Sequence, residues 1–294
     1  MRDLSKNLKE FNQVLEAAYK NVLSVIVYQN DKKIFENYYE RGQIKPHSYE
    51  RMAIMSCNKS IISALAGIAI NMGYIRDVNQ HILDFFPEYL HKDSDPNILR
   101  IRIKHLLTMT SGFYYLRLAG DSQPVAARAK QYDDEIKYIL DLPIENPDLS
   151  TFQYNNFDAS LMSAIVEKSS GMKIDEFANK YLFSKIGINA VDDIGVITTE
   201  EMARFGLLYL HKGNWNGEQI IPEYWVEQSA KNYGNGYGYM WWIQDDNMYM
   251  AFGAGGSMIM VIPNENAVVV SHCKNLKLGW RSPREAVREY LFKE

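Results

Sequence analysis

The sequence predicts an α+β fold, in which an antiparallel β-sheet is flanked by N- and C-terminal helices and carries an inserted, mostly helical domain. A helix followed by strands occupies one end of the 294-residue chain, and strands followed by a helix occupy the other. Between them, short helical patterns alternate with polar loops and β-branched alternation is largely absent. We therefore expect a discontinuous sheet domain from residues 1–73 and 189–294, and a helical domain from residues 74–188.

The first part of the chain reads as a helix, a hairpin and a second helix. The opening helix is predicted from apolar residues at helical spacing: Leu4, Leu8, Phe11, Val14, Leu15 and Ala18. Residues 22–28 are rich in β-branched side chains, and Asn30-Asp31 separates them from a second strand pattern at residues 33–39. The next helix begins near Ser56 and ends near Gly73, a suitable C-cap residue.

The inserted section contains three predicted helices, over residues 101–107, 159–169 and 174–183. Gly171 follows the second of these helices and supplies its stop signal. No long run with strand periodicity interrupts them. This pattern predicts a domain built mainly from helices.

The C-terminal part returns to strands after two helices. Thr198-Thr199-Glu200-Glu201 resembles a capping box for a helix over residues 202–211, and Pro222 begins a helix that runs to Ser229. Strand patterns follow over four segments: residues 237–243, 248–252, 258–262 and 267–272. A turn at residues 263–266 joins the last two as a hairpin. Ser282-Pro283-Arg284-Glu285 is a second capping box and predicts the C-terminal helix.

Composition excludes several classes of function. The formal net charge of -4 and the lack of a basic run argue against binding nucleic acid. The two cysteines, Cys57 and Cys273, form neither a disulfide framework nor a metal-binding spacing. The six histidines are scattered and show no paired spacing. We expect no metal site and no cofactor, and the sequence leaves the oligomeric state open.

The chain also shows no membrane or export signal. Its first residues are charged and lack an apolar segment of the kind found in secretory signals. The longest apolar run is bounded by Gly67 and Asn71 and is too short to span a bilayer. The expected location is therefore the cytoplasm.

Ser56 and Lys59 stand at the start of a helix that is apolar on almost every side over residues 61–70. Such a helix belongs in the middle of a fold, so a lysine in its first turn must find partners or lose its proton. Residues three apart share one helical face. A serine hydroxyl beside a desolvated amine is an activated nucleophile. Cys57 is an alternative nucleophile, although a small buried side chain is the better interpretation.

The spacing Ser-x-x-Lys is weak evidence by itself, because the chain contains it three times: Ser56/Lys59, Ser170/Lys173 and Ser271/Lys274. Ser170 lies at a helix C-terminus, where the helix dipole disfavours an alkoxide. Ser271 lies at a strand end, where residues three apart point to opposite faces. Only Ser56 combines its lysine with the positive end of a helix, which favours a catalytic role over an N-cap.

Tyr-x-Asn is equally weak, with four matches: Tyr19/Asn21, Tyr28/Asn30, Tyr154/Asn156 and Tyr233/Asn235. The first pair leaves a helix, the second enters the predicted hairpin turn, and the last falls in a glycine-rich loop. The pair at Tyr154 lies on a loop between helices, where a phenol can face a cleft.

Gly253-Ala254-Gly255-Gly256 lies between two predicted strands. A dinucleotide-binding fingerprint requires a helix next, so that interpretation fails. Two explanations remain equally open. The glycines either let a ligand approach the strand backbone, or they form a bulge or kink.

Taken together, these motifs resemble the serine β-lactamase and penicillin-binding-protein superfamily, particularly its class C-like branch with esterases and amide hydrolases. The matching pieces occur in the family's order: Ser56-Cys57-Asn58-Lys59, residues 103–112, Tyr154-Asn155-Asn156, residues 202–208, residues 237–242 and residues 253–256. The resemblance implies an antiparallel sheet domain and a helical domain, with the active site in the cleft between them. It implies a small ester, amide or β-lactam-like substrate.

The resemblance also assigns roles to residues. Ser56 would be the nucleophile that becomes acylated, and Lys59 and Tyr154 would share the general-base role. Asn156 would hydrogen-bond to the substrate or to Lys59. The oxyanion hole would be the backbone N–H of Ser56 and of the segment Gly253, Ala254 and Gly255, most directly that of Ala254.

One motif departs from the family pattern. Its third motif is usually Lys-Thr-Gly, Lys-Ser-Gly or His-x-Gly, and Ala251-Phe252-Gly253 stands in its place. His211-Lys212-Gly213 fits the histidine form, but it follows a helix. A cation at the third motif binds a substrate carboxylate, so its absence favours neutral ester or amide substrates. The alternatives are a β-lactamase or D-alanyl peptidase, and a ligand-binding relative without turnover.

Overall fold

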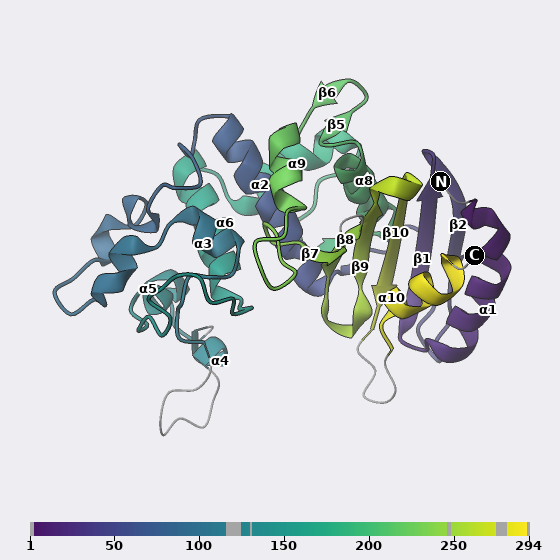
Figure 1. Cartoon of the computed structure of the whole chain (residues 1–294), viewed down its shortest axis with the longest axis horizontal. Helices are drawn as coiled ribbons and strands as arrows, with labels where there is room; N and C mark the ends of the chain where they lie inside the picture. Colours follow the sequence, from purple (N-terminus) through teal and green to yellow (C-terminus); the bar gives the residue numbers. More distant parts are fainter. Residues whose placement is uncertain (1–2, 116–124, 130, 246–247, 275–280, 293–294) are drawn as a thin grey trace.

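The computed structural model describes residues 3–115, 125–129, 131–245, 248–274 and 281–292, and it has the predicted α+β fold (Figure 1). One antiparallel sheet has the order β2-β1-β10-β9-β8-β7. Its strands are β1 (Val22–Gln29), β2 (Lys32–Tyr38), β7 (Trp242–Asp245), β8 (Met248–Phe252), β9 (Met258–Ile262) and β10 (Ala267–Cys273). The pairing of β1 with β10 joins strands from the two ends of the chain. The predicted antiparallel sheet and its two hairpins are confirmed.

Two terminal helices cover one face of the sheet. A 3₁₀ turn (Leu4–Asn7) leads into α1 (Leu8–Ala18), and α10 (Pro283–Ala286) continues as a π-helical turn (Val287–Leu291). Their apolar faces pack with strand residues in one buried cluster that includes Phe11, Leu15, Val287 and Leu291. Figure 1 shows α1 and α10 side by side against the sheet. The predicted flanking helices are therefore confirmed.

Helix α8 (Thr199–Leu210) covers the opposite face and contacts β1, β9 and β10. The predicted capping box is present: Thr198 accepts a hydrogen bond from the Glu201 N–H at 3.1 Å, and the Glu201 carboxylate accepts one from the Thr198 N–H at 2.7 Å. The helix begins three residues before the predicted start, because Thr198 itself is the N-cap. The second predicted capping box is wrong, since Ser282 makes no side-chain cap bond.

Helix α2 (Asn58–Asn71) runs between the sheet and the other helices (Figure 1). Every residue from Lys59 to Ala69 is buried, as its all-round apolar pattern predicts. It packs against α6 (Phe157–Ser170) on one side and β8 on the other. The remaining helices are α3 (Ile103–Leu107), α4 (Val125–Ala129), α5 (Glu135–Leu140), α7 (Ile174–Ala178) and α9 (Glu223–Ser229). Domain boundaries at residues 73/74 and 188/189 stay a prediction.

The prediction of a strand over residues 237–243 is wrong for most of its length. The strand β7 starts only at Trp242, and Met240 has a φ of 58°, in the left-handed region. The Met240 N–H donates to the Leu107 carbonyl at 2.9 Å. The apolar residues of this segment belong to a loop that is buried against the helices. A sequence pattern of apolar residues cannot distinguish such a loop from a strand.

No helix within the described ranges is both long enough and apolar enough to cross a membrane.

A short ribbon that the sequence did not reveal holds the start of α2. Strand β3 (Met52–Ala53) pairs with β4 (Val196–Ile197), and the Ile54 N–H donates to the Gly195 carbonyl at 2.9 Å. A second small ribbon joins β5 (Asn214–Trp215) to β6 (Glu218–Gln219). The first ribbon matters more, because it fixes the chain immediately before Ser56.

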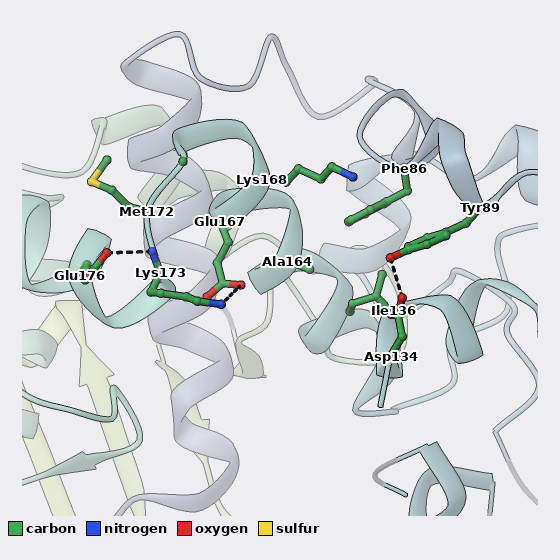
Figure 2. Close-up of a pocket in the computed structure, with 11 residues that line it drawn as sticks. Phe86, Tyr89, Asp134, Ile136, Ala164, Glu167, Lys168, Met172, Lys173 and Glu176 are labelled. Atoms are coloured by element: carbon green, nitrogen blue, oxygen red, sulfur yellow. Dashed lines mark hydrogen bonds and ion pairs between the residues drawn. The ribbon is translucent and has the colours of Figure 1, made fainter. Parts of the chain in front are cut away.

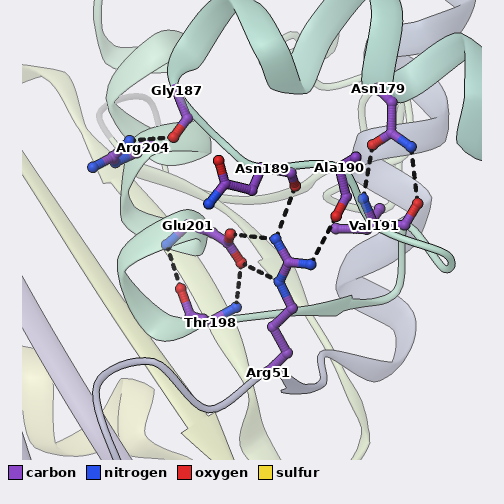
Figure 3. Close-up of polar contacts among 9 residues, drawn as sticks. All are labelled: Arg51, Asn179, Gly187, Asn189, Ala190, Val191, Thr198, Glu201 and Arg204. Carbon is purple, nitrogen blue, oxygen red and sulfur yellow. Dashed lines mark hydrogen bonds and ion pairs between the residues drawn. The ribbon is translucent and has the colours of Figure 1, made fainter.

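Arg51 anchors this ribbon (Figure 3). Its guanidinium donates to both Glu201 oxygens, at 2.8 and 3.2 Å, and to the carbonyls of Asn189 and Ala190, at 2.8 and 2.9 Å. Bidentate charged pairs are strong and directional. Since Glu201 also belongs to the capping box, one carboxylate ties the β3 segment to the start of α8.

Replacing Arg51 should therefore destabilise the protein. We expect Arg51→Ala to lower the free energy of unfolding by about 1–3 kcal/mol, because a charged pair and two carbonyl contacts are lost. Urea denaturation measures the change. Arg76→Ala is the control, because its exposed ion pair with Asp77 should contribute little. Equal stability of the two variants would contradict the anchoring role.

Candidate active site

Ser56 lies in a 3₁₀ turn (Met55–Cys57) that continues directly into α2. The residue before it, Met55, has a φ of 53°, which is uncommon for a residue with a side chain. The β3–β4 ribbon and the buried helix hold this conformation from both sides. As a result, the chain turns sharply at Ser56 and the hydroxyl borders a cavity rather than the core.

Lys59 brings the predicted nucleophile and two other segments together. Its side chain is buried with 5% exposure, and its amine donates to Ser56 Oγ at 3.2 Å and to Asn156 Oδ1 at 2.8 Å. Burial lowers the pKa of Lys59 to about 8, since the charged form loses water. The protonated form still dominates at pH 7, where about a tenth of the amine is neutral.

Tyr154 completes the predicted group of side chains. Its ring lies 5.1 Å from the Lys59 amine and stacks on Trp242 at 5.3 Å. Burial raises the pKa of Tyr154, and the nearby Ser56 side chain opposes this in part. The structure thus brings Ser56, Lys59, Tyr154 and Asn156 together.

The competing candidates have other surroundings. Cys57 is fully buried, its Sγ donates to the Ser257 carbonyl at 3.3 Å, and burial raises the pKa of its thiol. Ser170 donates to the Val166 carbonyl at 2.7 Å within its own helix. Ser271 is buried and donates to the Gly256 carbonyl at 3.3 Å. None of these contacts pairs the side chain with an amine.

The glycine-rich segment is a tight connection between β8 and β9. Residues Ala254–Gly256 form a 3₁₀ turn after Gly253. A Cβ on Gly253 would lie 2.5 Å from the Ile54 carbonyl and 3.2 Å from the Ser56 nitrogen. Gly253 has a φ of -119°, so its missing side chain provides space rather than conformational freedom. This close approach places the turn beside the Ser56 backbone.

A cavity of about 740 Å³ opens at Ser56. Ser56, Lys59 and Asn156 line it, together with residues of α2, α5, α6 and the segment before β4. Three carboxylates also line it, those of Glu135, Glu167 and Asp193, whereas Lys59 is the only cation among the described lining residues. The lining does not include Tyr154, Gly253, Ala254 or Gly255. The cavity therefore opens on the Lys59 and Asn156 side of the serine.

A second cavity of about 460 Å³ adjoins the first (Figure 2). The two share Ile136, Ala164 and Glu167 as lining residues. At the far end the Lys168 amine lies 5.1 Å from the Phe86 ring. The hollow surface thus continues from Ser56 along α6.

Ala251-Phe252-Gly253, which stands in place of the family's third motif, lies at the end of β8. Ala251 and Phe252 are the last residues of β8, and Ala251 is buried. His211 follows α8 and pairs with Asp31 at 2.7 Å, so His211-Lys212-Gly213 does not replace the motif.

Sequence reasoning missed two aromatic residues that hold Tyr154. Tyr237 and Trp242 both lay in the strand predicted over residues 237–243. In the structure Tyr237 contacts both Tyr154 and Trp242 edge-on, at 6.1 and 4.8 Å. Their place in the motif run 237–242 was the available signal. It could not reveal which ring faces the site.

Comparison with known proteins decides the family. The Beta-lactamase family model matches residues 11–192, which is more than half of the chain. The chain belongs to the beta-lactamase family. Among curated proteins it is 24% identical over 244 residues to a 6-aminohexanoate-dimer hydrolase of Paenarthrobacter ureafaciens, covering 76% of this chain and 60% of that protein. The chain thus spans less than two thirds of that relative's length.

Solved structures of beta-lactamase-like proteins share the fold. A putative beta-lactamase from Bacteroides dorei matches with a TM-score of 0.75 at 15% identity, over 100% of both chains. EstCE1, a hydrolase with promiscuous acyltransferase activity, matches with a TM-score of 0.78 at 14% identity, over 99% of this chain and 98% of that one. A putative 6-aminohexanoate-dimer hydrolase from Bacillus anthracis matches with a TM-score of 0.74 at 19% identity, over 96% of this chain and 80% of that one.

The space around Gly253 gives a test of this packing. We expect Gly253→Val to lower the free energy of unfolding by about 1–3 kcal/mol, because the side chain would overlap the Ile54 carbonyl. Thermal or urea denaturation measures the change. Ala254→Val is the matched control, because Ala254 is exposed and the same side chain there should change stability by less than about 0.5 kcal/mol. Similar stabilities would refute the close packing.

Proposed function

We propose that this beta-lactamase family member is a serine hydrolase that forms an acyl-enzyme at Ser56 and cleaves small ester or amide substrates. The observation that carries the proposal is the buried Lys59 amine, hydrogen-bonded to both Ser56 and Asn156 beside a cavity. We place this site between a sheet domain of residues 1–73 and 189–294 and a helical domain of residues 74–188.

Lys59 is the general base in this proposal. Its neutral amine takes the proton of Ser56 as the serine oxygen attacks the substrate carbonyl carbon and forms a tetrahedral intermediate. Collapse of the intermediate breaks the bond to the leaving group, which departs with that proton. Water then attacks the acyl-enzyme in the same way, and the acid and free Ser56 are released.

Tyr154 acts as a proton relay rather than as the base. Its raised pKa keeps the phenol protonated at neutral pH, whereas the lowered pKa of Lys59 supplies a neutral amine. A protonated phenol beside Ser56 can donate to the leaving group and receive a proton from Lys59. This proposal is more specific than the family resemblance, which implies that Lys59 and Tyr154 share the role of general base.

The oxyanion hole is assigned to the backbone N–H groups of Ser56 and Ala254. The Gly253 N–H already donates to the Ser257 carbonyl at 2.8 Å, so it is occupied. Gly253 also brings the turn within van der Waals reach of the Ser56 nitrogen. Ala254 follows immediately and is exposed, which suits a donor that binds substrate oxygen. Gly255 serves the turn, with a φ of 85°.

The charge of the cavity favours substrates without a carboxylate. Glu135, Glu167 and Asp193 line it, and the third-motif cation is replaced by Ala251. Negative groups around a cavity repel an anionic ligand. An amide or ester substrate agrees with the names of the relatives, a 6-aminohexanoate-dimer hydrolase and EstCE1. A β-lactamase or penicillin-binding protein is the alternative, favoured by the family.

Activity-based labelling tests the nucleophile. We expect a fluorophosphonate to add one mass increment to the intact protein, because Ser56 is activated by a desolvated amine. Ser56→Ala should abolish the increment, and Ser170→Ala, which changes a second Ser-x-x-Lys serine, should retain it. An increment that survives in a folded Ser56→Ala variant would refute the nucleophile.

The same preparation separates the three candidate activities. Turnover of short-chain esters or amides supports the proposed hydrolase. Turnover of nitrocefin or a stable penicilloyl adduct would favour the β-lactamase alternative. A folded protein that neither becomes labelled nor turns over any of these substrates would be a ligand-binding relative.

The pH dependence of acylation tests the base. Lys59 must be neutral to accept the proton, so kcat/KM should rise about tenfold per pH unit below the pKa and level off above about 8. Lys59→Met should lower kcat/KM by about 100- to 10,000-fold. Lys173→Met, at an exposed lysine of the second Ser-x-x-Lys match, should leave the profile unchanged. A flat profile between pH 6 and 9 would contradict the assignment.

A further inference from the structure

Asp158 is a fully buried carboxyl beneath the loop that carries Tyr154 and Asn156. It lies in the first turn of α6 with 0% exposure. Its Oδ2 accepts a hydrogen bond from Asn155 Nδ2 at 3.0 Å, and its own N–H donates to Asn155 Oδ1 at 2.8 Å. These two bonds join Asp158 to the residue that stands between Tyr154 and Asn156.

The capping arrangement at this helix is unusual. Asn156 is the N-cap residue of α6, yet its side chain makes no cap hydrogen bond. Its Oδ1 accepts from the Lys59 amine instead, at 2.8 Å. The capping role has passed to Asn155, which accepts from the Asp158 N–H three residues along the chain. Asn156 is thereby free to hold the lysine.

Asp158 also faces the segment that follows α3. Burial raises the pKa of Asp158 to about 7, while Ser111 of that segment and Asn155 lower it in part. Within the described residues, neither Ser111 Oγ nor Asp158 Oδ1 has a hydrogen-bond partner. The same segment accepts the Gln153 N–H at the Met109 carbonyl, at 2.8 Å. The loop is thus held at both ends.

The contacts place Asp158 close to the reacting groups without touching them. Tyr237 contacts Tyr154 edge-on. Burial raises the pKa of Tyr237, and the nearby hydroxyl of Tyr154 and carboxyl of Asp158 raise it further. Burying a carboxyl is costly, and a helix start alone requires only a capping side chain at the surface. A buried polar group in this position is better explained by the loop above it.

We propose that Asp158 is a positioning residue, which acts through Asn155 to hold Tyr154 and Asn156 on their two sides of the Lys59 amine. The inference rests on the proposed function of Ser56, Lys59 and Tyr154. Displacement of a reacting group by about 1 Å can cost about 100-fold in rate, so loss of this support should act on kcat. Substrate binding in the cavity should change little, because Asp158 does not line it.

The decisive comparison uses Asp158→Ala and Asp158→Asn. We expect Asp158→Ala to lower kcat about 10- to 100-fold on a short-chain ester, with KM changed less than about threefold. Asp158→Asn should restore kcat to within about threefold of wild type. Its amide oxygen can accept from Asn155, and its amide nitrogen can donate to the Ser111 hydroxyl.

Asp95→Ala is the matched control. Asp95 also holds a loop of the helical region, since it accepts from the backbone N–H groups of Asn97 and Ile144 at 2.9 Å each. Its substitution should lower the unfolding temperature without the loss of kcat. Should Asp158→Ala not fold, Asn155→Ala removes the loop end of the same contacts, and the same fall in kcat is expected from it.

The outcomes separate this inference from the proposed function. If the wild-type protein neither turns over esters nor becomes labelled at Ser56, the proposed function fails. If wild type is active and folded Asp158→Ala or Asn155→Ala keeps its kcat, the positioning role is wrong. A loss of kcat that Asp158→Asn does not restore would also overturn it, because the amide preserves the contacts that carry the proposal.

Discussion

The desolvation of one amine organises this structure. Lys59 lies in the first turn of a helix that is buried from Lys59 to Ala69, and burial is the main cause of its lowered pKa. A buried ammonium needs acceptors, and a neutral amine can accept a proton. The Lys59 amine has two oxygen partners within hydrogen-bond distance, Ser56 Oγ and Asn156 Oδ1. The segments around the site place Ser56 and Asn156 next to the Lys59 amine.

Those segments come from distant parts of the chain, and each is fixed by its own contacts. The β3–β4 ribbon and Arg51 hold the turn before Ser56. The β8–β9 turn reaches the Ser56 backbone because Gly253 lacks a side chain. The aromatic pair Tyr237 and Trp242 holds the ring of Tyr154. The distance of 3.2 Å between Ser56 Oγ and the Lys59 amine, the proposed nucleophile and base, therefore depends on packing throughout the fold.

The sequence was informative where a local rule decides the structure. Periodicity predicted the terminal helices and α2, turn residues predicted the β1–β2 hairpin, and motif order predicted the family. It failed where tertiary contacts override the local pattern. Residues 237–241 form a buried loop, Thr198 starts α8 earlier, and the two-residue strands β3 and β4 are too short for any periodicity. The proximity of Tyr154 to Lys59 came only from family resemblance, since no local rule joins residues so far apart.

The missing third-motif cation bears on recognition more than on the base. By resemblance, a lysine on that strand would bind a substrate carboxylate and lower the pKa of nearby amines through like-charge repulsion. In this chain, burial is the dominant cause that lowers the pKa of Lys59. In the proposed mechanism, the pKa of the base is therefore set by its position on α2, without a second cation. Ala251 offers no attraction for an anionic substrate, and the carboxylates of Glu135, Glu167 and Asp193 make the cavity lining more negative. The departure from the family thus bears on the proposed substrate rather than on the proposed acylation of Ser56.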